Sequence, residues 1–547
     1  MTTPATTPAK TNGFEPLYEP LFRDRWIASI VSNLGGWMQD TAGTWLMAVL
    51  TSSPLLIALM QTAASLPVVL LGLLAGATAD IFDRRRLLIF WQAWMLAAVA
   101  ILSVLTFCGV VSAWVLLILT FALNIGAAMN NPAWQAIIPE LVPRSQVPDA
   151  VSLNSAGYNL ARAVGPALGG LAIAAFGQHV DTGAGTVFVL NSLSFVGVIV
   201  VLYRWHRTPL FKSALPAERI FGSVRSGIRY IRYSPVLQAT LVRAFIFTIF
   251  VSAGWALLAV VARRDLQQGA LGYGILNGSL GLGAVIGATS LARLRRAFSA
   301  DAIIAISTIA FAATLTVLAF VPIPAIIVVF LIAGGFAWTS TMSTLNVSVQ
   351  LSVPSWVQAR ALGAYQMVLQ CGMALGAVIW GVVAEHFSTP IALVCAAAGL
   401  LISLPFAFRF HVLRGTLPDL RPFRLKRAAP ELGLERQPTD GPVRVSISYC
   451  IRPEDYDAFT RAIHQLRDVR LRDGAIRWGV FQDVSDPVHL NETFLVESWI
   501  EYLRQRERLT AAGRQIRDKV MSFHQGSDPP KVSHMIYARQ PGDSGAP

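Results

Sequence analysis

The first apolar segment of the chain carries polar side chains at helical spacing. Four residues recur at i, i+4, i+7 and i+11 and therefore share one side of a helix: Asn33, Trp37, Asp40 and Thr44. At about 1.5 Å per residue, Asp40 lies about 21 Å along this helix from Trp26. A carboxylate at that depth in an apolar segment can exchange a proton when its surroundings change, which is the chemistry of proton coupling.

An arginine lies at a similar depth in a later apolar segment. Arg162 is about 18 Å from Ala150, where that segment begins. A lone charge in hydrocarbon is costly, so we expect Asp40 and Arg162 to pair with each other or to meet water in a cavity. Asp40 would carry the proton, while Arg162 or an anionic substrate, such as a siderophore-like catechol or carboxylate, competes for it. Two other interpretations remain open: an ion pair that never titrates, and a charge that only shapes the cavity wall.

Further polar side chains fall inside apolar segments, and we expect them to line the same cavity: Asn154, Asn159, Gln366 and Gln370. A segment that only anchors a protein has no reason to bear the cost of polar groups in a bilayer, so these residues favour a carrier. The four cysteines show neither a CxxC pattern nor ligand spacing. We therefore expect no disulfide framework, no metal site and no cofactor.

The elements that hold these side chains must lie mostly in lipid. Of the 547 residues, 54% are hydrophobic and 14% are charged, with a mean hydropathy of +0.54. Of the 75 Lys, Arg, Asp and Glu residues, 39 lie from His411 onward, so a more soluble region follows the apolar one. Most of the net charge of +13 falls in short segments between apolar runs, which argues against nucleic-acid binding and indicates membrane orientation.

Twelve segments are long and apolar enough to cross a bilayer, which takes about 20 helical residues. We expect them near 26–49, 55–78, 87–109, 112–137, 150–177, 186–204, 236–260, 271–292, 302–321, 325–349, 360–384 and 390–410. The basic short loops fall on one side of these spans, and such loops stay in the cytosol. The sequence thus predicts an all-α, multi-pass membrane protein with both termini in the cytosol.

Matches at a single offset indicate an internal duplication. A shift of 211 residues places Gly76 on Gly287 and, far downstream, Gly165 on Gly376. Two parallel six-span repeats around a site at the membrane midplane form an alternating-access carrier. The expected segments are a disordered cytosolic tail, a six-helix half, a basic cytosolic connector and a second six-helix half, at 1–20, 21–204, 205–235 and 236–410.

The loop between the second and third spans carries a charged motif formed by Gly76, Asp80, Arg84 and Arg85. It resembles the G-x-x-x-D-R-x-G-R-R type motif of the major facilitator superfamily, although Ile81 and Asp83 depart from that pattern. Over residues 20 to 410 the chain resembles the efflux branch of transmembrane secretion effectors that includes the enterobactin exporter. The resemblance implies secondary transport of a small molecule, and no Walker A pattern suggests ATP as the driver.

The fifth span contains closely spaced small residues together with a proline: Gly165, Pro166, Gly169 and Gly170. They resemble the end of a motif that the superfamily associates with antiporters, which implies export in exchange for protons. Small residues at this spacing also allow close helix packing in lipid, with no further role, and we expect Gly76 to serve helix packing as well. Both interpretations remain open.

Charged residues near the cytosolic ends of the spans predict a gate, with these members: Asp80, Arg84, Arg85, Asp149, Arg295, Arg296 and Arg360. The fold that the resemblance implies brings the loop after the second span near the start of the eleventh. We expect Asp80 to face Arg360 in the outward-open state and, by symmetry, the arginines of the later loop to face Asp149. Such pairs contribute about 0–1 kcal/mol each. Alternatively, the arginines only set the topology.

From Gly441 the pattern changes to short alternating runs typical of a soluble α+β domain. Strand-like and helix-like runs follow in the order βαββαβ over 441–540, which we call the C-terminal domain, after a linker at 411–440. This order resembles ferredoxin-like modules that pair into α+β barrels, a group that includes small cofactor-independent monooxygenases. No nucleophile–base or metal spacing joins its histidines and tryptophans, so we expect cytosolic dimerisation or ligand sensing rather than catalysis.

The predicted function is export of a small amphiphilic molecule, of siderophore or drug type, by proton-coupled alternating access. The expected partners are this substrate, protons and the lipid bilayer, with a homodimer formed through the C-terminal domain. Two alternatives remain. One is an uptake carrier, and the other is a membrane-anchored sensor or monooxygenase whose activity lies in residues 441–540.

Overall fold

A computed structural model describes residues 14–205, 220–354, 356–405, 409–412, 419–421, 423, 440–526 and 528–538. Most of the predicted tail, the first part of the predicted connector and most of the predicted linker lie outside these residues. The chain divides into two compact units. We call Met1–Pro216, Leu241–Asn346 and Gly363–Phe410 the helical body, and Ala217–Thr240, Val347–Leu362 and His411–Pro547 the C-terminal unit.

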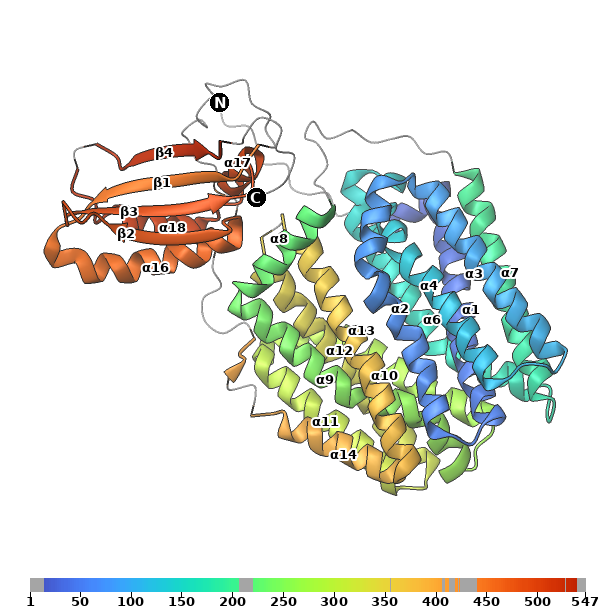
Figure 1. Ribbon diagram of the computed structural model, residues 1–547. Helices are drawn as coiled ribbons and strands as arrows, with labels where there is room; N and C mark the ends of the chain where they lie inside the picture. Colours follow the sequence, from blue (N-terminus) through green and yellow to red (C-terminus); the bar gives the residue numbers. More distant parts are fainter. Residues whose placement is uncertain are drawn as a thin grey trace, which may run out of the picture. The chain divides into compact units, whose positions relative to one another are not determined.

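Long helices build the helical body (Figure 1). Those before the predicted connector are α1 (Pro20–Leu50), α2 (Pro54–Ile81), α3 (Arg84–Phe107), α4 (Ala113–Ala136), the short α5 (Ile138–Leu141), α6 (Val147–Ala174) and α7 (Val180–Arg204). Those after it are α9 (Pro235–Val260), α10 (Ala270–Ala297), α11 (Ala300–Phe320), α12 (Pro324–Ser352), α13 (Gln358–His386) and α14 (Thr389–Ile402). Hydroxyl N-caps, such as Ser53 on α2 and Ser388 on α14, set where several of them begin.

Nine helices of the described chain are long and apolar enough to cross a membrane. Neither α1 nor α6 belongs to this group, and these helices carry Asp40 and Arg162 among other polar residues. The last helix, α14, has 14 residues and ends at Ile402, short of the span predicted to reach residue 410. The two helices that hold Asp40 and Arg162 are therefore long helices outside this group of nine.

The helices of the body pack against partners far away in the chain. Helix α1 lies against α6 and α7, α2 against α4, α3 against α7, and α11 against α14. Helix α10 packs along α6 and also contacts α1. Many of their buried side chains form one large apolar cluster, in which Trp45, Phe188 and Phe311 are among the largest, and smaller clusters lie beside it. Helices α1, α6 and α10 thus meet one another, and the predicted polar residues lie on two of them.

A four-stranded antiparallel sheet forms the C-terminal domain (Figure 1). Its strands are β1 (Val443–Cys450), β2 (Arg477–Gln482), β3 (His489–Val496) and β4 (Lys531–Ile536), in the order β2-β3-β1-β4. In the register, Val443 stands opposite Val496 on β3 and Ile536 on β4. Helices α16 (Tyr456–Asp473) and α18 (Ala511–Met521) lie along one face. Alternate strand residues such as Val445 and Phe494 are buried on a single side of the sheet.

Two helices in this unit were not predicted as such. The segment between β3 and β4 contains α17 (Trp499–Glu507) as well as α18, because Thr510 caps the second helix by accepting a hydrogen bond from the Gly513 amide at 3.2 Å. The predicted connector contains α8 (Ile220–Arg232), in which apolar residues and arginines follow a helical period. The basic connector is therefore partly a structured, amphipathic helix.

Candidate substrate and proton site

The centre of the candidate site is a group of aromatic and charged side chains from α1 and α6. The guanidinium of Arg162 lies over the ring of Trp37, 5.8 Å from its centroid. The ring of Tyr158, one turn earlier on α6, meets Trp37 edge-on with 6.1 Å between centroids. The π face of Trp37 therefore offers its negative potential to the arginine, which stabilises a charge that has no carboxylate partner in the described part of the chain.

Asp40 lies near the middle of α1 with an exposed side chain. Among the described residues it makes no ion pair or hydrogen bond, and its charge acts on the hydroxyls of Tyr158 and Tyr273. The sequence predicted either pairing with Arg162 or contact with water, and the pairing is not formed. An accessible carboxylate beside two phenols can gain and lose a proton without breaking an ion pair first.

Helix α10 supplies side chains that the sequence did not single out. Asn277 donates to the Thr41 hydroxyl on α1 at 3.4 Å, and Tyr273 stacks on Trp45 with 5.8 Å between ring centroids. Tyr273 and Asn277 are four residues apart and so share a helix face, which is the one signal that sequence reasoning had for them. Helices α1, α6 and α10 thus all contribute to the surroundings of Asp40.

Several predicted cavity residues are engaged within their own helices. The Asn33 amide donates to the Ser29 hydroxyl at 3.3 Å, and the Asn159 amide donates to the Ser155 carbonyl at 2.9 Å. Both bonds span one helical turn, so these amides satisfy themselves locally. The remaining predicted residues are half-buried or exposed and have no described contact with Asp40 or Arg162: Asn154, Gln366 and Gln370.

The small residues of α6 lie where backbones approach closely. A Cβ at Gly170 would lie 2.5 Å from the Ala270 carbonyl oxygen of α10, and one at Gly165 would lie 2.6 Å from the Cβ of Trp37. Gly169 faces the backbone of α1 in the same way, and Pro166 is buried beside it. Gly76 needs correction as a packing residue, because a Cβ there would meet nothing within 4 Å.

At one end of the body, residues of α2 and α13 are joined. The Glu385 carboxylate accepts hydrogen bonds from the Ser53 hydroxyl at 2.9 Å and from the Leu55 amide at 3.3 Å, so it caps the first turn of α2. The Arg264 side chain also donates to the Ser52 carbonyl. Helices from opposite sides of the connector are therefore linked at this end, which carries the short loops.

The predicted gating residues lie at the other ends of these helices. Arg85 donates to the Leu202 carbonyl at 2.9 Å and to that of Tyr203, and so ties α3 to α7. Arg295 donates to the Ser343 carbonyl at 3.0 Å.

Among the residues that the structure describes, no ion pair joins Asp149 to Arg295 or Arg296. Arg296 is exposed, Arg84 begins α3, and Arg360, in the C-terminal unit, donates to Ser226 at 2.7 Å. The side chain of Asp80 lies outside the described residues.

Residues 11–542 match the family described as transmembrane secretion effector, so the match includes the C-terminal domain. The uncharacterized MFS-type transporter YfiS of Bacillus subtilis (strain 168) is 27% identical over 402 residues, covering 71% of this chain and 94% of that protein. The multidrug efflux pump Tap of Mycolicibacterium fortuitum is 24% identical over 401 residues, covering 72% and 95%. The enterobactin exporter EntS of Escherichia coli O1:K1 / APEC is 26% identical over 280 residues, covering 50% and 64%.

Solved transporters share the fold of the helices. A bacterial homolog of the human lysosomal transporter Spinster, in an inward-facing and occupied conformation, has a TM-score of 0.57 at 14% identity, covering 72% of this chain and 97% of that chain. A D-xylose-proton symporter has a TM-score of 0.56 at 14% identity, covering 71% and 97%.

Proposed function

Because the chain belongs to the transmembrane secretion effector family of the major facilitator superfamily, we propose that it exports a small amphiphilic molecule by proton-coupled alternating access. It is a multi-pass membrane transporter and not an enzyme. Relatives whose names refer to multidrug, macrolide and enterobactin export support a substrate of drug or siderophore type. In this proposal, α1–α4 with α6 and α7 form one six-helix repeat, and α9–α14 form the other.

The observation that carries the proposal is the state of Asp40. It is an accessible carboxylate in the middle of α1, with no ion pair to any residue that the structure describes, and its charge acts on Tyr158 and Tyr273 of two neighbouring helices. A charge kept in a membrane helix without structural compensation is costly, which supports a functional role. Asp40 takes up a proton from the outer side and releases it to the cytosol, while Arg162 and Trp37 hold the substrate between α1 and α6.

The bonds of Glu385 close the outer side of the carrier in this proposal, with both termini in the cytosol. The bonds to Ser53 and Leu55 then break when the carrier opens outward, and the cytosolic pairs of Asp80 with Arg360 and of Asp149 with Arg295 or Arg296 form instead. Each exposed pair contributes about 0–1 kcal/mol, so neither set would trap the carrier. The C-terminal domain lies in the cytosol, and pairing of two such domains makes the carrier a homodimer.

Transport by the purified full chain in proteoliposomes tests the proposal. A siderophore, a macrolide and a lipophilic cation are offered in turn on the cytosolic face, with the opposite face made acidic. We expect at least one probe to move toward the acidic side, and we expect a protonophore to abolish its accumulation. Movement in the same direction as the protons would favour an uptake carrier. A flux that ignores the pH gradient would refute proton coupling.

A further inference from the structure

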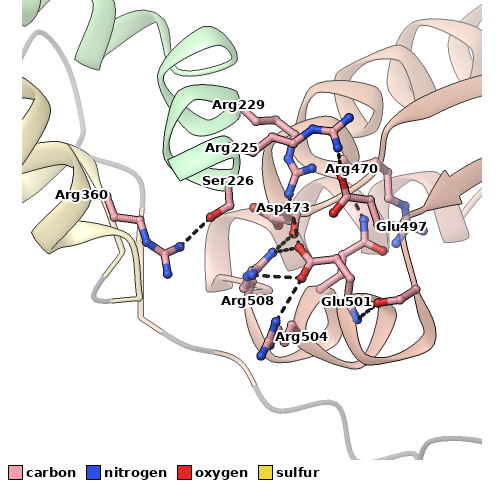
Figure 2. Close-up of polar contacts among 12 residues, drawn as sticks. Arg225, Ser226, Arg229, Arg360, Arg470, Asp473, Glu497, Glu501, Arg504 and Arg508 are labelled. Atoms are coloured by element: carbon pink, nitrogen blue, oxygen red, sulfur yellow. Dashed lines mark hydrogen bonds and ion pairs between the residues drawn. The ribbon is translucent and has the colours of Figure 1, made fainter. Parts of the chain in front are cut away.

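Helix α8 carries basic side chains that meet acidic residues of the C-terminal domain (Figure 2). Arg225 forms an ion pair with Glu497, and Arg229 lies 3.3 Å from the Glu501 carboxylate. The first pair is accessible, with its side chains 63% and 35% exposed, whereas the side chains of the second are only 12% and 11% exposed. Burial lowers the pKa of Arg229, and Glu501 opposes that shift. A charge buried this far needs its counter-ion.

Glu501 is also held firmly from within the domain. Arg508 donates to its carboxylate at 2.5 Å and to the Asp473 carbonyl at 2.9 Å, and Arg504 lies 3.8 Å from its second oxygen (Figure 2). The Glu501 carboxylate is thus oriented independently of α8, because residues of its own helix and of the end of α16 hold it in place. A pre-oriented acid at the base of α17 makes a specific docking point for an arginine.

The neighbouring face of α8 contacts the ends of α12 and α13. Arg360 of α13 donates to the Ser226 hydroxyl at 2.7 Å (Figure 2), and the Tyr230 hydroxyl donates to the Ser352 carbonyl of α12 at 3.3 Å. The turn between these helices carries Trp356, whose ring meets Tyr230 edge-on at 5.8 Å between centroids. Helix α8 is therefore held between the domain and this turn.

One residue of the domain reaches the turn directly. The guanidinium of Arg508 lies 4.4 Å from the ring centroid of Trp356, while the same side chain binds Glu501. Tyr233, just after α8, packs in addition against the domain's apolar cluster around Val443 and Trp499. Charged, aromatic and apolar contacts thus join α8, the turn and the domain into a single packed group.

We propose that the C-terminal domain is a brace that docks on α8 and fixes the ends of α12 and α13, and that transport at full rate needs the docked state. Helices α9, α12 and α13 all have an end in the C-terminal unit, whereas no described helix before the connector does. The domain therefore fixes α8 to the second half of the carrier alone. The transport part of this inference rests on the proposed function.

Removal of the central charge tests the docking in the full chain. In Glu501→Gln, we expect the backbone amides of 220–234 to exchange with deuterium about tenfold faster, because hydrogen bonds between charged groups are among the stronger ones. We expect the transport rate to fall several-fold. The matched control is Asp518→Asn, which breaks an exposed pair with Arg514 in the same domain and should change neither quantity.

A change on α8 itself excludes unfolding of the domain as the cause. Arg225→Glu should speed exchange of the same amides about threefold, as expected for an accessible pair, and Arg225→Glu with Glu497→Arg should restore it. Unchanged exchange in both Glu501→Gln and Arg225→Glu would overturn the docking. Faster exchange with wild-type transport would overturn the brace.

A covalent link provides the opposite experiment. Arg225→Cys with Glu497→Cys, in a chain whose four native cysteines are replaced, is joined by a bifunctional methanethiosulfonate reagent to lock the docked state, because a direct disulfide would need the two backbones closer than a pair of long side chains requires. We expect the locked protein to transport at the unlocked rate, and inhibition that a reductant reverses would overturn the brace. If wild-type protein moves none of the probes, the proposed function fails, while the exchange measurement still decides the docking.

Discussion

Two carboxylates in this molecule, Glu492 of the sheet and Asp40 of the helical body, are treated in opposite ways. Glu492 is fully buried and accepts hydrogen bonds from Arg470 at 2.9 Å, from the Trp478 indole at 3.0 Å and from the Tyr449 hydroxyl at 3.1 Å. Asp40 is exposed and has no ion pair or hydrogen bond among the described residues. A buried carboxylate whose oxygens are fully hydrogen-bonded stabilises the fold, whereas an accessible carboxylate can take up and release a proton.

One arginine from each of the two regions repeats the contrast. Burial alone would lower the pKa of Arg470, but the attraction of Glu492, its hydrogen bonds and the nearby Tyr449 raise the pKa above its usual range. Arg162 has the π face of Trp37 and no carboxylate partner among the described residues. A substrate anion can therefore approach Arg162 without displacing a described carboxylate, whereas an anion at Arg470 would have to displace Glu492.

The largest expected effect is the loss of stability when Glu492, the buried carboxylate of the sheet, is replaced. Glu492→Gln leaves Arg470 buried without its counter-ion, and breaking such a pair costs about 3–5 kcal/mol. The domain should unfold at a markedly lower temperature, which can be followed through deuterium exchange of the backbone amides of β1 and β3 on heating. Asp518→Asn, on the domain surface, should leave the transition in place. Equal transitions in the two variants would remove the structural role from Glu492.

Removal of the functional arginine should affect binding but not folding. Arg162→Ala should weaken binding of an anionic siderophore about tenfold or more, since hydrogen bonds to charged groups contribute about 1.5–3 kcal/mol. Arg162→Lys should recover part of the affinity. The measurement is a binding titration in detergent, with a lipophilic cation as the comparison ligand. A loss of equal size for anion and cation would point to general damage of the site.

Two glycines of the helical body, Gly170 and Gly76, differ in the space around them and should tolerate a side chain differently. Gly170→Ala places a methyl group against the Ala270 carbonyl, and overpacking of this kind costs about 1–3 kcal/mol. Gly76→Ala has open space and should be neutral. Thermal unfolding and transport rate of the two variants should differ accordingly. If both behave like the wild type, α6 and α10 are not held at this distance during transport.

The smallest effect concerns pH and the C-terminal domain. Burial, with help from Arg506, lowers the pKa of His534 below its usual 6.5. The unfolded chain then binds a proton more readily than the folded domain, so stability is full above the unfolded pKa and falls as pH drops below it. Unfolding midpoints between pH 5 and 8 should show this slope, and His534→Gln should flatten it. A slope that survives the substitution belongs to another group.

Helical spacing alone placed Trp37 and Asp40 on one side of α1, and in the structure Trp37 meets Arg162 and Tyr158. It did not indicate Tyr158, Tyr273 or Asn277, since their importance comes from the meeting of three helices that no local pattern encodes. The order of strands and helical segments in the C-terminal domain followed from alternation of apolar residues. The division of the second helical segment into α17 and α18 could not be predicted in this way. Thr510 can be recognised as the N-cap of α18 only when the end of α17 is known.

The connector shows what charge patterns miss. Its arginines predicted a cytosolic segment, and that prediction explains why the segment is positively charged. It does not identify their partners, Glu497 and Glu501, which lie about 270 residues away in the chain. Likewise, Arg295 was expected opposite Asp149 and donates instead to the Ser343 carbonyl. Every residue has a backbone carbonyl, so the sequence does not show which carbonyls accept hydrogen bonds. An arginine that binds a carbonyl therefore cannot be distinguished from one that binds a carboxylate.

Proton-driven transport by Asp40→Asn tests the central claim most directly. Proteoliposomes with the wild-type chain or this variant are given the same pH gradient, and substrate accumulation and substrate affinity are both measured. We predict that the variant binds substrate about as well as the wild type and accumulates none against its gradient. Accumulation that still rises with the pH gradient in Asp40→Asn would contradict the account and remove Asp40 from the proton path.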